Sequence, residues 1–461
     1  MKPNNVMKLI LCVLMVALIS GCSLTSTDAD QALAKLDDKK ETTIRVMYYD
    51  EQYFMQRFGN LFMAKYPNIN IEVVSTRDMY TNNQDPKTMY AKFIETEKPD
   101  VLLLPTGEME RLVGEQLLYD LEPVIAQDKF DIENIQPTII EYLKMKGGGK
   151  LYGLSPTFSN EVLLINRDLF TKQGVQLPEG KLNWEDVMLL AQRFPASQDS
   201  SERVYGYSQG TYRNDPYNLM MRIAESSGLT LENEGKSALL TPSWKQLFEQ
   251  VVAVYKSGCI ARDQNNLEIG TTFTQEEWLL RDPFIAGKSA MTIASSYEIG
   301  NLIQAERTLK DRSFNWEILS APAGDQADQS TNFSLNDIFA INSKSSNIRA
   351  AWEFIKYINS DEIARVYSKT PNELWSRTSY MTLKDGKSLE PFYELTFNRN
   401  ETSEHDDYYG VRYQLNDIAN KEMDEVIADK KTIDQALEAI DKQLQIDLDQ
   451  LKTAKDTPAK Q

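Results

Sequence analysis

Residues 151–194 read LYGLSPTFSNEVLLINRDLFTKQGVQLPEGKLNWEDVMLLAQRF, and this stretch decides the fold. The apolar run at 162–165 is rich in Val, Leu and Ile, which predicts a buried strand. Asn183 stands where a helix N-cap belongs, and the two acidic residues that follow Trp184 favour the positive end of a helix. The stretch therefore predicts a strand, a loop punctuated by glycine and proline, and a capped helix within an α/β domain.

The chain before this stretch also alternates between strands and helices. The predicted strands are residues 44–48, 69–73 and 101–104, and a helical stripe is formed by Phe54, Phe58, Leu61 and Phe62. Repeated β-α-β order implies a mainly parallel sheet with helices on both faces. In such sheets ligands bind beyond the carboxyl ends of the strands. That rule selects residues 50–51, after the first strand, and residues 105–108, after the third.

The chain after this stretch predicts a second α/β lobe between Tyr205 and about Leu319. A strand at residues 316–319 is followed by Pro322 and Gly324, which mark a hinge. The chain ends in a long amphipathic helical region.

The N-terminus has the pattern of an export signal. Lys2 and Lys8 precede an eleven-residue apolar core at 9–19, which is too short to span a bilayer that needs about 20 residues. The core ends in Leu-Ile-Ser-Gly-Cys22, which looks like a bacterial lipobox, although an ordinary secretory signal with an incidental cysteine is the alternative. A two-chain lipid on Cys22 would hold the protein stably on a membrane.

The charge and the cysteine count narrow the range of possible functions further. The formal net charge is −18, and removing residues 1–21 takes away two lysines and no acids, which gives −20. So acidic a chain shows no sign of the basic surface that a nucleic-acid-binding protein needs. Cys12 leaves with the signal and Cys22 would be lipidated, so only Cys259 stays as a free thiol, which we interpret as a packed small residue.

The sequence offers little evidence of a catalytic site. The single histidine, His405, lies in a polar run typical of a solvated loop, and no GxSxG elbow is present. Residues 287–289 read Gly-Lys-Ser like the end of a phosphate loop, but Asp282 occupies the position that requires glycine. Carboxylate pairs are plentiful, so a two-carboxylate glycosidase stays open as an alternative.

Several of these segments together resemble one known family. Tyrosine-glycine-leucine-X-proline at 152–156, the strand ending in Asn166, the Trp-Glu-Asp helix start at 184–186 and the run at 287–293 occur in the family's order. They are similar to the extracellular solute-binding lipoproteins of ABC importers, of the maltose-binding type (family 1). The resemblance extends from about residue 42 to about residue 448, and several ordered matches are more specific than one short motif.

The resemblance implies an α/β, two-lobed periplasmic-binding-protein-like fold, in which each lobe is a mainly parallel sheet flanked by helices and a multi-strand hinge joins the lobes. We expect a signal peptide at residues 1–21, a lipidated cysteine with a flexible tether at 22–42, and a frayed tail at 452–461. Between the tether and the tail we expect lobe I, residues 43–155 plus 320–370, and lobe II, residues 156–319 plus 371–451.

The resemblance and the strand-end rule together select the ligand residues. We expect the solute to contact Asp50, Glu51, Thr106, Glu108, Ser159, Tyr212, Tyr297, Trp375 and Tyr409. In the family, the residue at the position of Tyr297 is commonly an aromatic that stacks on the ligand. Trp375 replaces a frequent family proline, which puts its family role in doubt. The carboxylates could equally be solvated surface groups, and any of these aromatics could be a core residue.

The expected function is capture of an extracellular solute for an ABC importer by closure of two lobes around it. The resemblance implies a sugar or oligosaccharide, a permease with its ATPase as partner, no cofactor, no catalytic or metal residue, no nucleic acid and a monomeric protein. The expected location is the outer face of the bacterial membrane, anchored at Cys22. The alternatives are a secreted carbohydrate-active hydrolase and a ligand sensor for a membrane receptor.

Overall fold

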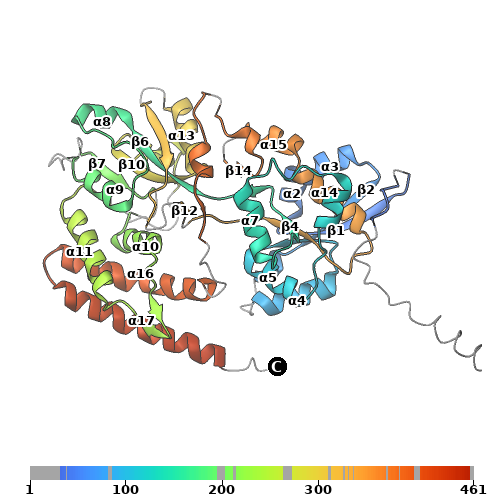
Figure 1. Cartoon of the computed structure of the whole chain (residues 1–461). Coiled ribbons are helices and arrows are strands. Elements are labelled where there is room, and N and C mark those ends of the chain that lie inside the picture. The colour runs from blue at the N-terminus through green and yellow to red at the C-terminus, as the bar shows by residue number, and fades with distance from the viewer. Residues whose placement is uncertain are drawn as a thin grey trace, which may run out of the picture.

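A computed structural model describes most of the chain after the N-terminal segment. The described residues are 32–37, 39–80, 86–194, 203–210, 214–262, 272–309, 313–324, 328–330, 332–335, 337–369, 372–383, 385–398 and 405–456. Two groups of helices and strands lie side by side, each around a sheet of its own (Figure 1). We call the group around the N-terminal strands the first unit and the other the second unit.

The first unit is built on a five-stranded sheet. In spatial order its strands are β2 (Ile69–Ser75), β1 (Thr42–Tyr48), β3 (Val101–Leu104), β13 (Ile338–Ile341) and β4 (Gly153–Leu154). Strand β1 is parallel to both of its neighbours, and Val46 faces Val73 on one side and Val101 on the other. Strand β13 is antiparallel to β3 and β4. The three strands predicted at the start of the chain are therefore confirmed.

Helices cover this sheet. They are α2 (Glu51–Phe54), the π-helix η1 (Met55–Gly59), α3 (Asn60–Lys65), η2 (Arg77–Tyr80), α4 (Pro86–Glu97), α5 (Thr106–Gly114), α6 (Glu122–Asp128), α7 (Pro137–Lys146), α14 (Ile348–Ile358) and α15 (Asp361–Tyr367). Phe54, Phe58 and Phe62 recur every fourth residue and are fully buried. Their rings pack against Phe339 of β13 and Phe354 of α14. Three members of the predicted stripe thus pack the helices onto the sheet, whereas the fourth, Leu61, is 38% exposed and was wrongly included.

A group of charged residues ties α6 to α14. Arg349 donates to both carboxylate oxygens of Asp128 at 3.0 and 2.9 Å, and Lys356 donates at 2.8 Å. Glu353 is paired with the same two cations. We call Asp128, Arg349, Glu353 and Lys356 the helix cluster. Burial alone would raise the pKa of Asp128, but the hydrogen bonds from Arg349, Lys356 and Trp352 outweigh it and hold that pKa well below its usual range.

The second unit is built on a four-stranded sheet. Its strands, in spatial order, are β11 (Trp316–Ser320), β6 (Glu161–Asn166), β10 (Ser289–Ser295) and β7 (Tyr205–Ser208). Strand β6 is antiparallel to β11 and β10, whereas β10 and β7 are parallel. The predicted α/β fold class is confirmed, but the sheets are mixed where we predicted mainly parallel ones. Strands β6 and β13 each follow a segment by which the chain enters the unit from the other one. Each therefore starts where the two units meet and runs away from that place, antiparallel to both neighbours in its sheet.

The helices of the second unit include α8, which lies where the sequence pattern predicted a loop. They are α8 (Arg167–Gln173), α9 (Trp184–Ala191), α10 (Pro216–Ser226), α11 (Pro242–Lys256), α12 (Gln275–Leu279), α13 (Ser296–Thr308), α16 (His405–Ile427) and α17 (Ile433–Asp456), with a small hairpin of β8 (Glu232–Asn233) and β9 (Lys236–Ser237). We predicted a loop after Asn166, but Asn166 caps α8 by accepting from the Leu169 amide, and Gly174 ends α8 in the left-handed conformation. The predicted cap at Asn183 is confirmed as a capping box with Asp186.

The chain passes between the two units three times, and the passages pair with one another. The short strand β5 (Thr157–Phe158) pairs with β14 (Leu374–Trp375), and Ser159 exchanges backbone hydrogen bonds of 2.9 and 3.0 Å with Ser334. Nearby, β12 (Gln329–Ser330) pairs with β15 (Thr396–Phe397). Two 3₁₀ turns complete this region: η4 (Thr378–Tyr380) and η5 (Glu390–Tyr393). The junction is therefore formed by several paired segments.

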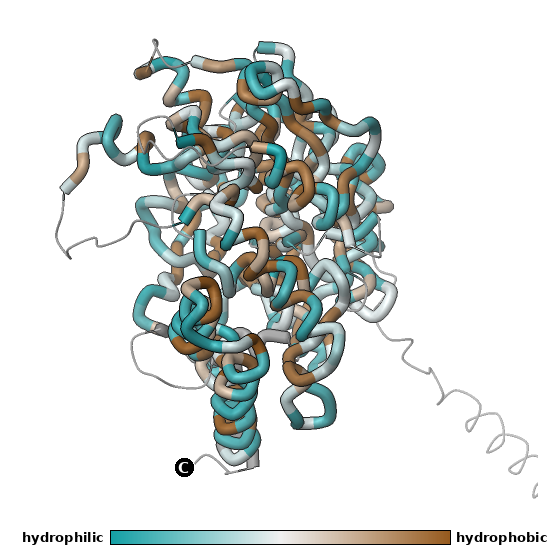
Figure 2. Tube along the Cα trace, turned by 90° about the vertical axis from the view of Figure 1, so that its left-hand side faces the viewer, coloured by the Kyte–Doolittle hydropathy of each residue, from teal (hydrophilic) through white to brown (hydrophobic). Residues whose placement is uncertain are grey.

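Two long C-terminal helices, α16 and α17, lie along the second unit (Figure 1). Their buried residues, among them Leu415, Met423, Leu437 and Leu444, belong to the same apolar core as α9, α10 and α11. In Figure 2 the helix nearest the C-terminus is largely hydrophilic with separate hydrophobic positions, the pattern of a helix with one buried face. Among the described residues, no helix combines the length and the apolar composition that crossing a membrane requires.

Candidate functional site

The ends of strands from both sheets meet the segments that pass between the units. In the first sheet β1, β2, β3 and β4 end toward this junction, since the next residues of β4 lead directly into β5. In the second sheet β10 and β7 end there, because Ser295 at the end of β10 pairs with Glu161 at the start of β6. Ligands of open α/β sheets bind beyond such ends. We therefore place each predicted site residue relative to these two edges.

Asp50 and Glu51 follow β1 as predicted. The Asp50 carboxylate caps α2 by accepting from the Tyr53 amide at 2.9 Å, and it also pairs with Arg77. Glu51 is exposed in the first turn of that helix. Asp50 thus has a structural role as an N-cap, whereas Glu51 presents its carboxylate to solvent.

Thr106 and Glu108 open α5 after β3. Thr106 is half-buried at the first helical position. Glu108 is buried, and its Oε2 accepts from both Nε and Nη2 of Arg111, at 3.0 and 2.8 Å. This pair, in which a single carboxylate oxygen accepts both N–H groups, holds Glu108 against its own helix, which favours a structural role for that carboxylate.

Ser159 and Trp375 lie in the passages between the units. Ser159 is half-buried, and its backbone is bridged to Ser334. Trp375 is only 4% exposed, and its ring stacks on Tyr367 with centroids 5.5 Å apart. Trp375 therefore contributes to the apolar packing of the junction in this structure.

Tyr297 has the surroundings expected of a ligand-lining residue. Strand β10 continues to Ser295, whose hydroxyl caps α13 by accepting from the Tyr297 amide at 3.2 Å. Tyr297 is just past the end of β10, and it is 52% exposed. Its ring is available to a solute, and the alternative that Tyr297 is a core residue does not fit this exposure.

Two tyrosines on the opposite edge are equally exposed, and the sequence reasoning missed both. Tyr49 and Tyr53 follow β1 and are 53% and 50% exposed. Large aromatic side chains seldom stay open to solvent without a function when they gather at one place. A signal was available, since both flank Asp50 and Glu51, which the strand-end rule had selected.

Three predicted site residues cannot be located in this way. Cys22 and Tyr212 lie outside the described residues, and so does the side chain of Tyr409, although its backbone belongs to α16. Their proposed roles stay predictions.

The edge of the first sheet holds a group of charged side chains that sequence reasoning did not find. Arg57 projects from η1, and its Nη1 donates to Asp337 Oδ2 at 2.8 Å while its Nη2 pairs with Glu373 Oε1 at 2.9 Å. We call these three residues the strand-end cluster. Asp337 directly precedes β13, and Glu373 directly precedes β14, so three distant segments of the chain supply it. Arg57 also contacts Tyr48 Oη at 3.3 Å and Thr157 Oγ1 at 3.4 Å.

Burial and charge act against each other in this cluster. The side chain of Arg57 is 10% exposed, and those of Asp337 and Glu373 are 17% and 38% exposed. Burial would lower the pKa of Arg57, but the two carboxylates raise it well above its usual value. Burial raises the pKa of Glu373, and Arg57 only partly opposes this. The cluster contains two carboxylates and one cation, so with both acids ionised it carries an unbalanced negative charge.

The edge of the second sheet holds an ion pair next to the end of β10, since Glu161 is opposite Ser295 in the register. Glu161 opens β6 and pairs with Arg222 of α10, and both side chains are mostly buried. At the end of the neighbouring β7, Ser208 Oγ and Gln209 Oε1 are buried without a hydrogen-bond partner among the described residues. The two edges together thus combine open aromatic rings with hydrogen-bonding polar groups.

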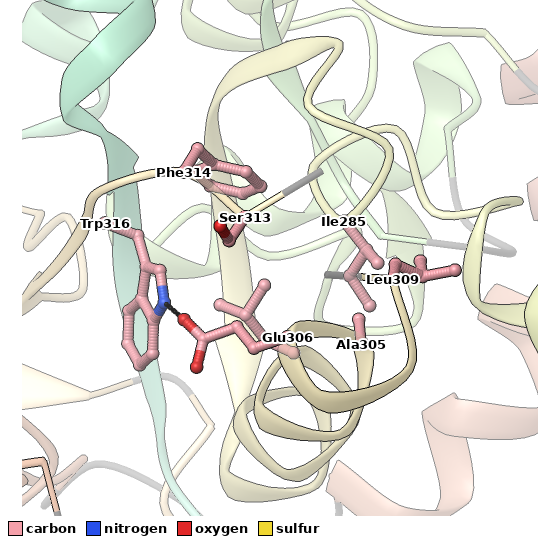
Figure 3. Close-up of a pocket in the computed structure, with 8 residues that line it drawn as sticks. Ile285, Ala305, Glu306, Leu309, Ser313, Phe314 and Trp316 are labelled. Atoms are coloured by element: carbon pink, nitrogen blue, oxygen red, sulfur yellow. Dashed lines mark hydrogen bonds between the residues drawn. The ribbon is translucent and has the colours of Figure 1, made fainter. Parts of the chain in front are cut away.

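Among the described residues, a small and a larger cavity of the second unit are lined by none of the predicted site residues. One, of about 10 Å³, lies between α13 and β11, where Glu306 accepts from Trp316 Nε1 at 2.6 Å (Figure 3). It has room for one water molecule at most. The other, of about 410 Å³, lies among α9, α10, α11 and residues 323–324. Within the described part of the chain, no group of His, Cys, Asp and Glu is arranged to hold a metal ion.

Several solved structures share this architecture. An extracellular solute-binding protein of family 1 from Alicyclobacillus acidocaldarius subsp. acidocaldarius DSM 446 matches with a TM-score of 0.63 and 16% identity, over 89% of this chain and 100% of that one. The sugar-binding protein MalE from Xanthomonas citri gives 0.59 and 14%, over 90% and 100%. The ABC substrate-binding protein Lmo0181 from Listeria monocytogenes, in complex with cycloalternan, gives 0.52 and 20%, over 89% and 100%. At these identities the matches establish the two-unit fold.

The family itself is established by sequence. No curated protein matches the chain. A family model described as bacterial extracellular solute-binding protein, however, matches residues 43–365, which is well over half of the 461 residues. This agrees with the resemblance carried by the motifs at 152–156, 184–186 and 287–293. The chain therefore belongs to the bacterial extracellular solute-binding proteins.

Proposed function

We propose that this protein captures an extracellular saccharide between its two units and delivers it to the permease of an ABC importer. The observation that carries the proposal is the exposure of Tyr53 and Tyr297 at the two strand edges that meet at the junction. Tyrosine rings stack on the apolar C–H faces of sugars and keep their hydroxyls available for hydrogen bonds. Family membership supports binding and transport, and the sugar-binding Xanthomonas protein and the cycloalternan-bound Listeria protein support a saccharide.

In this proposal the solute lies between the two edges. Tyr297 stacks on it from the second unit, and Glu51, Thr106 and Tyr53 contact it from the first. Tyr212 and Tyr409 are further candidates. The paired passages at 157–159 and 374–375 act as the hinge about which the units close. The boundaries 43–155 plus 320–370 and 156–319 plus 371–451 for the two lobes belong to the same proposal.

We also propose that Cys22 carries the lipid that anchors the protein at the outer face of the membrane. The lipobox pattern and the extracellular family support this placement. Cys22→Ala should leave the protein as an uncleaved precursor or release it into the medium, measured by cell fractionation and by palmitate labelling. A variant that is still processed and labelled would rule out Cys22 as the lipidation site.

The proposal assigns binding without turnover, as a monomer and without a cofactor. The family consists of binding proteins, which favours capture over the hydrolase alternative. Incubation with the bound saccharide should return it unchanged by chromatography. Release of shorter products by the purified protein would instead favour the hydrolase.

A solute screen tests the function directly. A ligand that binds only the folded state raises the melting temperature by mass action, so mono- and oligosaccharides from glucose to maltotetraose, and mannitol, should be compared with amino acids and peptides. At least one saccharide should shift the melting temperature, and small-angle scattering should then show a more compact particle. If only amino acids or peptides produce a shift, the proposed solute class is wrong.

A further inference from the structure

The strand-end cluster is placed where a bound solute would sense its charge. Arg57 contacts β1 through Tyr48, the start of β13 through Asp337, and two passages between the units through Thr157 and Glu373. The guanidinium of Arg57 also lies 5.9 Å from the centre of the exposed Tyr53 ring. The cluster therefore underlies the aromatic surface at the edge of the first sheet.

The second edge is tied to the same cluster. The Ser296 hydroxyl, next to Tyr297, donates to the backbone oxygen of Asn372 at 3.1 Å. Asn372 directly precedes Glu373. The residues that precede Tyr297 and Glu373 are thus in direct contact, which brings the start of α13 and the start of β14 together at the junction.

The cluster offers acceptors and little positive charge. Asp337 uses Oδ2 for Arg57, and Glu373 uses Oε1. The other oxygen of each carboxylate has no hydrogen-bond partner among the described residues, so it can accept from a hydroxyl group. Both terminal nitrogens of Arg57 already have acceptors, and Nε is buried without a partner in the described part of the chain.

The other cations described at these edges are also committed. Arg77 is paired with Asp50, and Arg222 is paired with Glu161. An anionic solute would therefore meet an excess carboxylate and find no uncommitted cation among them. Like charges that are partly shielded from water repel more strongly than they do in water.

We propose that Arg57, Asp337 and Glu373 select the solute by charge, admitting uncharged polyhydroxy compounds and rejecting their carboxylate- and phosphate-bearing counterparts. This inference rests on the proposed function, because it assumes that the solute binds at the strand edges. It goes further by assigning a specificity role to three residues that the family resemblance did not indicate. Asp337 and Glu373 accept from solute hydroxyls, while Arg57 positions both carboxylates.

The test compares matched pairs of solutes by calorimetric titration of the full-length protein. The probes are glucose with glucuronate and glucose 6-phosphate, galactose with galacturonate, and mannose with mannose 6-phosphate. We expect each neutral sugar that binds to do so at least about tenfold more tightly than its anionic counterpart. An anionic counterpart that binds as tightly as the neutral sugar would overturn the proposal.

Glu373→Gln sharpens the test, because it removes the excess charge and keeps a hydrogen-bond acceptor. Arg57 keeps Asp337 as its partner, so the variant should fold. The preference for neutral over anionic sugars should fall at least about fivefold, and Asp337→Asn should have the same effect. Glu362→Gln is the matched control, since Glu362 pairs with Lys65 on the surface of the first unit. An unchanged preference in both cluster variants, or an equal change in the control, would contradict the assignment.

Failure of this inference can be distinguished from failure of the proposed function. If saccharides bind but charge has no effect, only the charge selection is wrong. If no saccharide binds and amino acids do, the proposed solute class is wrong, and glutamine compared with glutamate then tests the same cluster. Glutamate binding as tightly as glutamine would overturn the charge selection as well.

Discussion

The strand-end cluster and the helix cluster are both mostly buried groups of mixed charge in the first unit, yet they differ in balance and in position. The helix cluster has two acids and two cations, and it joins α6 to α14. The strand-end cluster has two acids and one cation, and it lies where the strands meet the passages between the units.

The difference indicates which cluster stabilises the fold and which acts on a solute. A balanced group satisfies its charges internally, so its loss is felt mainly in folding. An unbalanced group at an accessible edge keeps a field that a solute can sense, and carrying it costs stability. The raised pKa of Glu373 and the lowered pKa of Asp128 express this contrast.

The largest effect is expected from Asp128→Asn. The substitution leaves Arg349 and Lys356 with one acid between them, and breaking a buried ion pair costs about 3 kcal/mol or more. The midpoint of urea unfolding should fall clearly, while solute affinity per folded molecule stays the same. Asp434→Asn, in the exposed pair with Lys245, is the control and should change the midpoint little. Loss of affinity without loss of stability would reverse the roles assigned to the two clusters.

Tyr297→Ala should have the next largest effect, and on binding alone. Removing a stacking ring should weaken solute binding by about 1–3 kcal/mol, which is roughly tenfold to a hundredfold. The unliganded melting temperature should hardly move, because the ring is half exposed. Tyr413→Ala, at a more exposed position on α16, should leave both quantities unchanged. Should stability collapse instead, Tyr297 belongs to the packing.

Acid titration should reveal the contribution of Asp128 in the helix cluster to the unfolding free energy, and this effect should be smaller. The folded pKa of Asp128 is depressed, so its stabilising contribution is full above the unfolded value of about 3.9 and is lost as pH falls toward the folded pKa. The difference in unfolding free energy between the wild type and Asp128→Asn should be constant above about pH 5 and shrink by at most about 1.4 kcal/mol per pH unit below pH 4. A difference that grows on acidification would contradict the sign of the shift.

The smallest effect is expected from Glu362→Gln. Its pair with Lys65 is exposed on both sides, and such pairs contribute about 0–1 kcal/mol. The change in unfolding free energy should be close to the experimental error and should vanish at high salt. A cost as large as that of Asp128→Asn would mean that burial does not explain the contrast between the clusters.

The strands and capped helices were predictable because their signals are local. An apolar run such as 162–165 or an Asn183 before acidic residues carries its own information. The helix α8 was missed although it has comparable signals, the cap Asn166 and the terminal Gly174, because the polar residues after Asn166 resembled a turn. The antiparallel directions of β6 and β13 could not be derived locally, since they depend on how the chain passes between the units.

The site was predictable only in part for the same reason. The strand-end rule found the positions after β1 and β3, and the resemblance found Tyr297. Neither the rule nor the resemblance could find the strand-end cluster, because Arg57 pairs with a carboxylate 280 residues away, that of Asp337. Nor could a pattern show that Trp375 is buried against Tyr367. The pair of Glu108 with Arg111, by contrast, spans three residues of one helix and is a local signal that the sequence reasoning overlooked.

The π-helical turn η1 limits how the length of this chain can change. A π turn accommodates one residue more than an α-helical turn, and the hydroxyl of Tyr367 donates to the carbonyls of Gln56 and Arg57 within it. Deleting a residue there would restore a plain α-helix, and each α-helical residue rotates the chain by about 100°. Arg57 and Phe62 could then no longer face Asp337 and the core at once. The segment from β1 to α3 should therefore tolerate substitutions but neither insertions nor deletions.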